Sequence, residues 1–232
     1  MLEVNAIDAY YDETQVLFDV SLSIETGEVV SLVGRNGMGK TTTVRSILNL
    51  AEVRSGTIEY EGEDITGAPT EKIAQRGIGY VPEERDIFSD LTVVENLRMA
   101  GVDIGGAETE KRIEEVFERF PKLRELEDSK GGHLSGGEQQ MLTIGRALVG
   151  DNDLLLIDEP TEGLAPLIAE DVEKAVADLK GEKTILLIEQ STEFVYNLSD
   201  RIYGIVNGEI VYEGDPEDAR ETGDVKDILT VS

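Results

Sequence analysis

The stretch from Gly34 to Thr42 constrains this chain more than any other part of its sequence. It matches the phosphate-loop pattern G-x-x-x-x-G-K-[ST] through Gly34, Arg35, Asn36, Gly37, Met38, Gly39, Lys40, Thr41 and Thr42. The apolar run at residues 28–33 predicts a buried strand, and residues 41–50 predict a helix because their apolar residues recur at helical spacing. The motif therefore lies in the strand–loop–helix context that a phosphate loop requires.

The residue types in this stretch suit the binding of a polyphosphate. Glycine lets the backbone turn its N–H groups inward because no Cβ is in the way, and the helix N-terminus adds a partial positive charge. Lys40 can reach the β- and γ-phosphates, and the Thr41 hydroxyl can bind Mg²⁺. The sequence therefore predicts a nucleotide site, with an ordinary glycine-rich turn as the alternative.

Acidic residues dominate the charge of the chain. Its 232 residues include 49 Asp and Glu against 21 Lys and Arg, for a formal net charge of −28. Such a surface repels nucleic-acid phosphates, so we expect no nucleic-acid partner. A protein of a salt-loving organism, screened by molar salt, is the simplest explanation. The absence of cysteine excludes disulfides, and we expect neither a signal peptide nor a membrane span.

The order of the predicted elements indicates an α/β fold. Alternating or continuous apolar residues predict strands and hairpins at residues 1–33, 56–65, 78–81, 154–157, 184–188 and 201–212. Residues 87–149 instead have helical periodicity, which indicates a helical lobe inserted into the core, and Pro121 should end one of its helices. A further helix should begin at Pro166 and end at Gly181.

A second anion site is predicted where the segment Leu134-Ser135-Gly136-Gly137-Glu138 begins a helix. Ser135 and Glu138 form a capping box, which marks the helix N-terminus. Two glycines in a first turn reduce helix stability, so they make sense where a ligand approaches the exposed amides closely. Capping alone would give this segment a structural role, and the phosphate loop upstream favours the functional one.

Two carboxylates follow an apolar predicted strand. Asp158 and Glu159 come directly after residues 154–157, and parallel sheets bind ligands at the carboxyl ends of their strands. Asp158 is placed to hold Mg²⁺ and Glu159 to polarise the water that attacks a γ-phosphate, unless the two form a solvated acidic pair. Tyr10 and Tyr11 are either half-buried aromatics of the sheet, or one of them stacks on an adenine ring.

Taken in order, the phosphate loop, the helical segment, the Leu134–Glu138 segment and Asp158-Glu159 resemble the ATP-binding subunit of an ABC transporter. The resemblance covers essentially the whole chain and implies a RecA-like P-loop NTPase core at 1–86 and 150–232, an antiparallel β subdomain and a helical subdomain at 87–149. It also implies that Tyr11 stacks on adenine. Two such subunits would pair head to tail, so that the nucleotide on one loop faces the other subunit's Ser135, Gly136, Gly137 and Glu138.

Three positions depart from the usual family pattern. Glu83 stands where the family usually has a Gln that binds Mg²⁺ and water, Gln190 where it has a switch His, and Ala165 where it has an Asp that contacts the opposite subunit. These segments resemble the smaller ATP-binding subunit of branched-chain amino acid importers, with urea and amide importers as competitors. Gln190 can hydrogen-bond a γ-phosphate but cannot carry a proton. Whether Glu83 faces Mg²⁺ stays open, and His133 is expected to be a surface loop residue.

The resemblance implies an ATPase that hydrolyses MgATP and drives transport through separate membrane permease subunits. The implied catalytic residues are Glu159, Gln190 and Lys40, and the implied Mg²⁺ ligands are Thr41, Asp158 and Glu83. The implied partners are a second ATP-binding subunit, identical or different, and indirectly an extracytoplasmic substrate-binding protein. The chain would then lie at the cytoplasmic face of the membrane. The alternatives are a soluble ABC ATPase acting on nucleic acid or ribosomes and a module that binds ATP without hydrolysing it.

Overall fold

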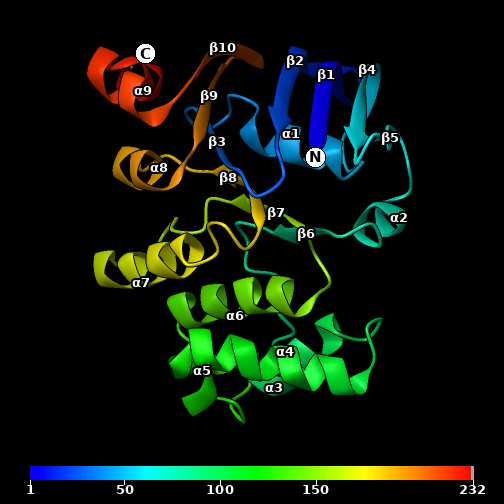
Figure 1. The fold of residues 1–232 in the computed structure, drawn as a ribbon, viewed down its shortest axis with the longest axis vertical. Helices are drawn as coiled ribbons and strands as arrows, with labels where there is room; N and C mark the ends of the chain where they lie inside the picture. Colours follow the sequence, from blue (N-terminus) through cyan, green and yellow to red (C-terminus); the bar gives the residue numbers. More distant parts are fainter. Residues whose placement is uncertain (231–232) are drawn as a thin grey trace. The chain divides into compact units, whose positions relative to one another are not determined.

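The computed structural model describes residues 1–230, whose contacts divide the chain into two compact units. The first unit comprises residues 1–78 together with the described residues from Lys180 onward, and the second comprises residues 79–179. Both units combine strands with helices (Figure 1). The predicted α/β class is confirmed.

The first unit contains an antiparallel sheet whose strands lie in the order β2-β1-β4-β5. These strands are β1 (Leu2–Tyr11), β2 (Thr14–Ile24), β4 (Glu52–Tyr60) and β5 (Glu63–Asp64). β1 pairs antiparallel with both β2 and β4, side by side in Figure 1. The tight turn between β4 and β5 is at Glu61-Gly62, where both residues have positive φ. The predicted hairpin is therefore confirmed.

A second set of strands in this unit leads to the phosphate loop. It contains β3 (Val29–Val33), β8 (Thr184–Ile188), β9 (Arg201–Val206) and β10 (Glu209–Gly214). β3 lies between β8 and β9 and is parallel to both, whereas β10 is antiparallel to β9. Every residue of β3 and β8 is buried, as expected for parallel strands covered on both faces. Asn207 and Gly208 have φ of 50° and 82°, so they form the predicted two-residue turn of the β9–β10 hairpin.

The helices of the first unit are short. They are α1 (Lys40–Ile47), α2 (Thr70–Ala74), α8 (Thr192–Leu198), α9 (Pro216–Thr222) and α10 (Asp224–Thr230). α1 ends at Ile47 rather than at the predicted Leu50. The physical reason is Asn49, whose left-handed φ of 55° lets the Leu50 N–H donate to the Arg45 carbonyl at 2.7 Å and closes the helix end.

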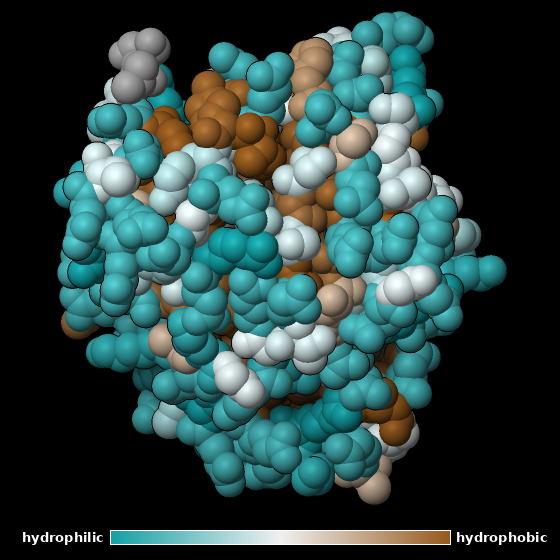
Figure 2. All heavy atoms as spheres, turned by 45° about the horizontal axis from the view of Figure 1, so that its top comes forward, coloured by the Kyte–Doolittle hydropathy of each residue, from teal (hydrophilic) through white to brown (hydrophobic). Residues whose placement is uncertain are grey.

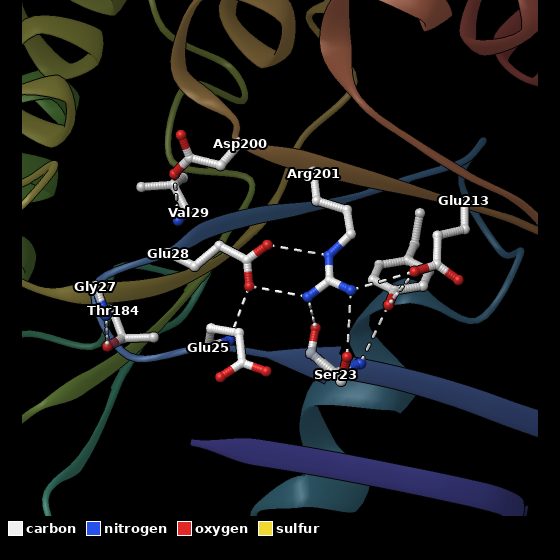
Figure 3. A network of polar contacts seen from close by, with 10 residues as sticks. Ser23, Glu25, Gly27, Glu28, Val29, Thr184, Asp200, Arg201 and Glu213 are labelled. Carbon is white, nitrogen blue, oxygen red and sulfur yellow. Dashed lines mark hydrogen bonds and ion pairs between the residues drawn. The ribbon is translucent and has the colours of Figure 1, made fainter.

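Arg201, the first residue of β9, ties together three segments of the first unit (Figure 3). Its Nε and Nη2 donate to the two carboxylate oxygens of Glu28 at 3.0 and 2.9 Å. Nη2 also donates to the Ser23 carbonyl at 3.0 Å, and Nη1 donates to Glu213 Oε1 at 3.2 Å. The guanidinium therefore joins the end of β2, the residue before β3 and the strand β10.

The second unit is built around α6 (Gly136–Val149), which contacts four other helices. These are α3 (Val93–Ala100), α4 (Gly106–Arg119), α5 (Pro121–Glu125) and α7 (Pro166–Ala177). The unit also contains β6 (Ile78–Val81) apart from its first residue, β7 (Leu154–Asp158) and the short 3₁₀ turn η1 (Gly131–His133). His133 is exposed, as predicted. Pro121 also begins a helix, because it occupies the first turn of α5. In a first turn the backbone N–H has no partner within the helix, so proline loses no hydrogen bond there.

The surface agrees with the composition. Hydrophilic side chains cover most of the face shown in Figure 2, with apolar side chains between them. Across residues 1–230, no helix combines the length and the apolar character needed to cross a membrane.

Candidate functional site

The phosphate loop occupies the connection between β3 and α1 in the first unit. Gly37 and Gly39 have φ of 80° and 112°, a region that residues with a Cβ rarely adopt. The Met38 N–H donates to the Arg35 carbonyl at 3.2 Å and closes the turn. A Cβ on Gly34 would lie 2.5 Å from the Ile205 carbonyl oxygen. The two ends and the middle of the loop therefore require the glycines that the motif supplies.

The β9–β10 hairpin supports this loop from behind. The Gly208 N–H donates to the Met38 carbonyl at 2.9 Å, and the Asn207 N–H lies 3.3 Å from Met38 Sδ. Gly208 itself accepts from the Phe18 N–H at 2.9 Å, and a Cβ on Gly208 would overlap the Val16 carbonyl oxygen. The sequence predicted this hairpin but gave no sign that its turn would contact the phosphate loop.

Lys40 lies within the curve of the loop. Its Nζ donates to the Arg35 carbonyl at 3.2 Å, and the residue is only 4% exposed. Lys40 is also the first residue of α1, whose N-cap, Gly39, makes no side-chain cap hydrogen bond within the described residues. A lysine cation and the amides of a helix N-terminus thus occupy one place, which suits a phosphate group. Thr41 follows and is half-buried, and Thr42 is buried.

Gln190 contacts the phosphate loop directly. Its Nε2 donates to Asn36 Oδ1 at 2.9 Å. The preceding Glu189 shapes the segment after β8, because its Oε1 accepts from the N–H groups of Gln190 and Ser191 at 2.8 and 3.1 Å. The structure thus brings together two predicted site residues that are 154 positions apart in the sequence.

The two candidate aromatics at the end of β1 have different surroundings. Tyr10 is engaged within the sheet: the Arg54 guanidinium lies 4.3 Å from its ring centroid, and its hydroxyl donates to Gln15 Oε1 at 2.8 Å. Tyr11 is 38% exposed. Of the two, Tyr11 is the ring that a ligand could stack on.

In the second unit, β7 ends in the predicted carboxylate pair. Asp158 is fully buried and Glu159 is 5% exposed. The Tyr80 hydroxyl on β6 lies 3.4 Å from Asp158 Oδ2. Glu159 has a φ of 43°, which is rare for a residue with a long side chain and costs of the order of 1 kcal/mol or more. Backbone strain at a buried acid is typical of functional sites, and nothing in the sequence pointed to it.

The segment that begins α6 is built as predicted. The Ser135 hydroxyl accepts from the Glu138 N–H at 3.4 Å, and Glu138 Oε2 accepts from the Ser135 N–H at 2.7 Å, which completes the capping box. Its glycines are packed closely: a Cβ on Gly137 would overlap Ile168 Cγ2, and a Cβ on Gly136 would lie 2.8 Å from Arg85 Nη1. A larger residue at Gly137 would therefore displace Ile168, and one at Gly136 would displace the Arg85 guanidinium. Arg85 was not predicted.

The remaining predicted positions are exposed. Glu83 lies in the loop after β6 and Ala165 is the N-cap of α7, and both are exposed to solvent. Over the described 1–230 range, no group of three or more His, Cys, Asp or Glu side chains forms a ready-made metal cluster. A divalent cation here would therefore need hydroxyl or substrate oxygens as well as carboxylates, which is the usual way proteins bind Mg²⁺ with a nucleotide.

Most of the segments described above lie within one family match. The family described as ABC transporter matches residues 17–162, more than half of the chain, including the phosphate loop, the Ser135–Glu138 segment and Asp158-Glu159. The chain belongs to the ABC transporter family. As an ABC protein of the ATP-binding type, it hydrolyses ATP.

Individual ABC proteins are similar over nearly the whole length. "High-affinity branched-chain amino acid transport ATP-binding protein BraG" of Pseudomonas aeruginosa is 42% identical over 212 residues, 91% of each chain. "Probable branched-chain amino acid transport ATP-binding protein LivF" of Archaeoglobus fulgidus is 38% identical over 92% of each chain. "Lipopolysaccharide export system ATP-binding protein LptB" of Haemophilus influenzae is 36% identical over 93% of this chain and 91% of that protein.

Solved structures agree with the sequence comparison. A nucleotide-free ATP-binding cassette from an ABC transporter has a TM-score of 0.86 at 29% identity, over 100% of this chain and 99% of that chain. A dimeric bacterial ABC transporter cassette has a TM-score of 0.83 at 25% identity, over 93% and 99%. The predicted P-loop NTPase fold is confirmed.

Proposed function

We propose that the chain is the ATP-hydrolysing subunit of an importer for branched-chain amino acids. The observation that carries this proposal is its 42% and 38% identity to BraG and LivF across more than nine-tenths of the chain. The 36% identity to LptB favours a second candidate, the ATP-binding subunit of a lipopolysaccharide exporter. The ATP-binding subunit of a urea or amide importer is a further alternative.

In this proposal two ATP-binding subunits pair head to tail beneath two membrane permease subunits. The dimeric cassette among the similar structures supports such pairing. Residues 1–86 and 150–232 form the nucleotide-binding core, and residues 87–149 form the helical subdomain. The assembly lies at the cytoplasmic face of the membrane and receives its cargo indirectly, from an extracytoplasmic substrate-binding protein.

ATP is held by the first unit of one subunit. Lys40 and the loop amides bind the β- and γ-phosphates, because a buried cation and a helix N-terminus both favour negative charge. Tyr11 stacks on the adenine ring. Gln190, already hydrogen-bonded to Asn36 at 2.9 Å, donates to the γ-phosphate as a neutral group, so its action is independent of pH over the physiological range.

The carboxylates supply the chemistry of hydrolysis. Thr41, Asp158 and Glu83 would hold Mg²⁺, which prefers oxygen donors. The ion, when bound, would supply positive charge that neutralises the phosphates. Glu159 orients the attacking water and polarises it as a general base. From the opposite subunit, Ser135 and the amides of Gly136, Gly137 and Glu138 contact the γ-phosphate of the same nucleotide.

The hydrolytic part of the proposal is tested with Glu159→Gln. Steady-state phosphate release should fall at least a hundredfold, because general bases contribute roughly 10²–10⁴-fold, while ATP binding and ATP-dependent dimerisation persist. Wild-type turnover in this variant would remove Glu159 from the role.

The transport part needs the assembled complex. Vesicles containing this chain and its membrane permease subunits should take up leucine in an ATP-dependent way, and Glu159→Gln should abolish uptake. Uptake of urea without leucine would contradict the branched-chain assignment, as would extraction of lipopolysaccharide.

A further inference from the structure

Arg85 hydrogen-bonds to one of the proposed nucleotide-site segments of the second unit and lies next to another. Its Nη2 donates to the Glu162 carbonyl at 2.8 Å, in the loop after β7. On its other side, a Cβ added to Gly136 would lie 2.8 Å from Nη1. One guanidinium therefore lies between the loop that follows Glu159 and the first residue of α6.

The geometry of Arg85 is locally unfavourable in two ways. Its backbone has a φ of 54°, and such conformations cost of the order of 1 kcal/mol or more in residues with a Cβ. Its cation lies beside the N-terminus of α6, where the helix macrodipole favours anions instead. Neither feature stabilises the fold locally, and such departures from local preference are expected at functional positions.

The Arg85 side chain has one hydrogen bond and one buried, unsatisfied donor. Its Nη2 donates to the Glu162 carbonyl, whereas its Nε is buried and has no hydrogen-bond partner among residues 1–230, a cost that again points to a functional position. The following residues are anchored to α6 by a second arginine. Arg146 donates to the Asp86 carbonyl and lies 4.7 Å from the Phe88 ring centroid. The peptide that carries Arg85 is thus attached to the same helix that its side chain touches.

The contact with Glu162 bears on Glu159. The Glu162 N–H donates to the Glu159 carbonyl at 3.1 Å, which closes a tight turn starting at the strained Glu159. Arg85 holds the carbonyl of the residue that closes this turn. A guanidinium suits this task because its fork donates in fixed directions, whereas a lysine ammonium is a point charge on a flexible stem.

We propose that Arg85 is a positioning residue for hydrolysis, which fixes the Glu159 turn relative to the first turn of α6. The inference rests on the proposed role of Glu159 as the catalytic carboxylate. Arg85 itself touches no reacting atom. Its loss should reduce kcat with little change in the affinity of the phosphate loop for ATP, because small misplacements of a catalytic group are costly for the chemical step.

The first test compares Arg85→Ala, Arg85→Lys and Arg98→Ala. Arg98 is the matched control, because it forms an exposed two-point ion pair with Glu110 in the same unit. Arg85→Ala should lower kcat about tenfold or more, with the Kd for a fluorescent ATP analogue within twofold of wild type. Arg85→Lys should recover only part of the loss, and Arg98→Ala should behave as wild type.

The second test is a double-mutant cycle. It compares the effect of one substitution on kcat in the wild-type and in the Arg85→Ala background, so a loss of stability in Arg85→Ala alone cannot decide its outcome. A Cβ on Gly136 meets the Arg85 guanidinium and also adds bulk at the proposed γ-phosphate contact. Part of the loss of kcat in Gly136→Ala should therefore be absent in an Arg85→Ala background. Gly137→Ala is the contrast, because its Cβ overlaps Ile168 rather than Arg85. Its effect on kcat should therefore multiply with that of Arg85→Ala.

Several results would overturn the inference. They are an unchanged kcat in Arg85→Ala, full recovery by Arg85→Lys, a parallel loss of ATP affinity, or independent effects of Gly136→Ala and Arg85→Ala. If Glu159→Gln kept wild-type turnover, the proposed function of Glu159 would fail instead. The two failures are therefore distinguishable.

Discussion

The ion pair between Arg201 and Glu28 gives a quantitative test of what holds the first unit together. Removing one partner of a buried pair costs roughly 3–5 kcal/mol, because the other charge stays buried and uncompensated. The Arg201 and Glu28 side chains retain 24% and 15% of their exposure, so solvent screening reduces our expectation for Arg201→Met to about 2–3 kcal/mol. This corresponds to a fall in Tm of about 4–12 °C for a chain of this size.

The assay is urea unfolding followed by far-UV circular dichroism, at a fixed salt concentration. Arg98→Met is the control, because Arg98 holds Glu110 with the same two-point geometry while both side chains are about half exposed. Its loss should cost less than about 1 kcal/mol. The midpoint should move in Arg201→Met without a change in the m-value, which would show that stability rather than compactness has changed.

A double variant tests the cause. Replacing both Glu28 and Arg201 by Met removes the uncompensated charge, so it should be more stable than Arg201→Met alone by about 1 kcal/mol or more. Equal losses in Arg201→Met and Arg98→Met would refute the reasoning, since burial would then have no effect on the value of the pair. A double variant less stable than Arg201→Met would refute it as well.

Three further predictions concern salt, the phosphate loop and pH. Because 49 acidic residues face 21 basic ones, Tm should fall as KCl is lowered from molar to millimolar; a flat Tm would contradict this. Gly34→Ala should weaken ATP binding more than tenfold in a calorimetric titration, because its Cβ would lie 2.5 Å from the Ile205 carbonyl oxygen. The control Gly106→Ala should bind ATP normally, because a Cβ on Gly106 would lie in open space. The N–H groups of Asp218 and Glu217 lower the pKa of Asp215 at the start of α9. Its contribution to stability is therefore complete above the unfolded-state pKa and lost as pH falls through the lower folded value; an NMR titration with a midpoint at or above the ordinary aspartate value would exclude it.

Much of the local structure could be predicted from the sequence, because its signals are local. The phosphate loop, the capping box at Ser135 and the Asn207-Gly208 turn each depend on residues within a few positions of one another. The expected β6 at residues 78–81 and β8 at residues 184–188 match the structure to the residue. The errors concern the ends of helices: α1 stops at Ile47, α7 ends at Ala177 rather than at the predicted Gly181, and Pro121 begins a helix as well as ending one.

What the sequence could not supply are contacts between distant residues and strained backbones. Gln190 was assigned by resemblance, but its hydrogen bond to Asn36 has no local signature. The same holds for Arg85, whose proposed role rests on the surroundings of its side chain. The positive φ of Glu159 could not be predicted either, since glutamate has no preference for that region of backbone conformation.

The contact between the Asn207-Gly208 turn and Met38 has a consequence for how the protein is made. The two partners lie 169 residues apart, so a polypeptide under synthesis contains the whole phosphate loop long before the turn that supports it. A chain truncated after β8 should contain every residue of the loop and yet bind ATP poorly, whereas a chain that includes β9 and β10 should bind it. We therefore expect nucleotide binding to be acquired last, through residues that do not themselves belong to the motif.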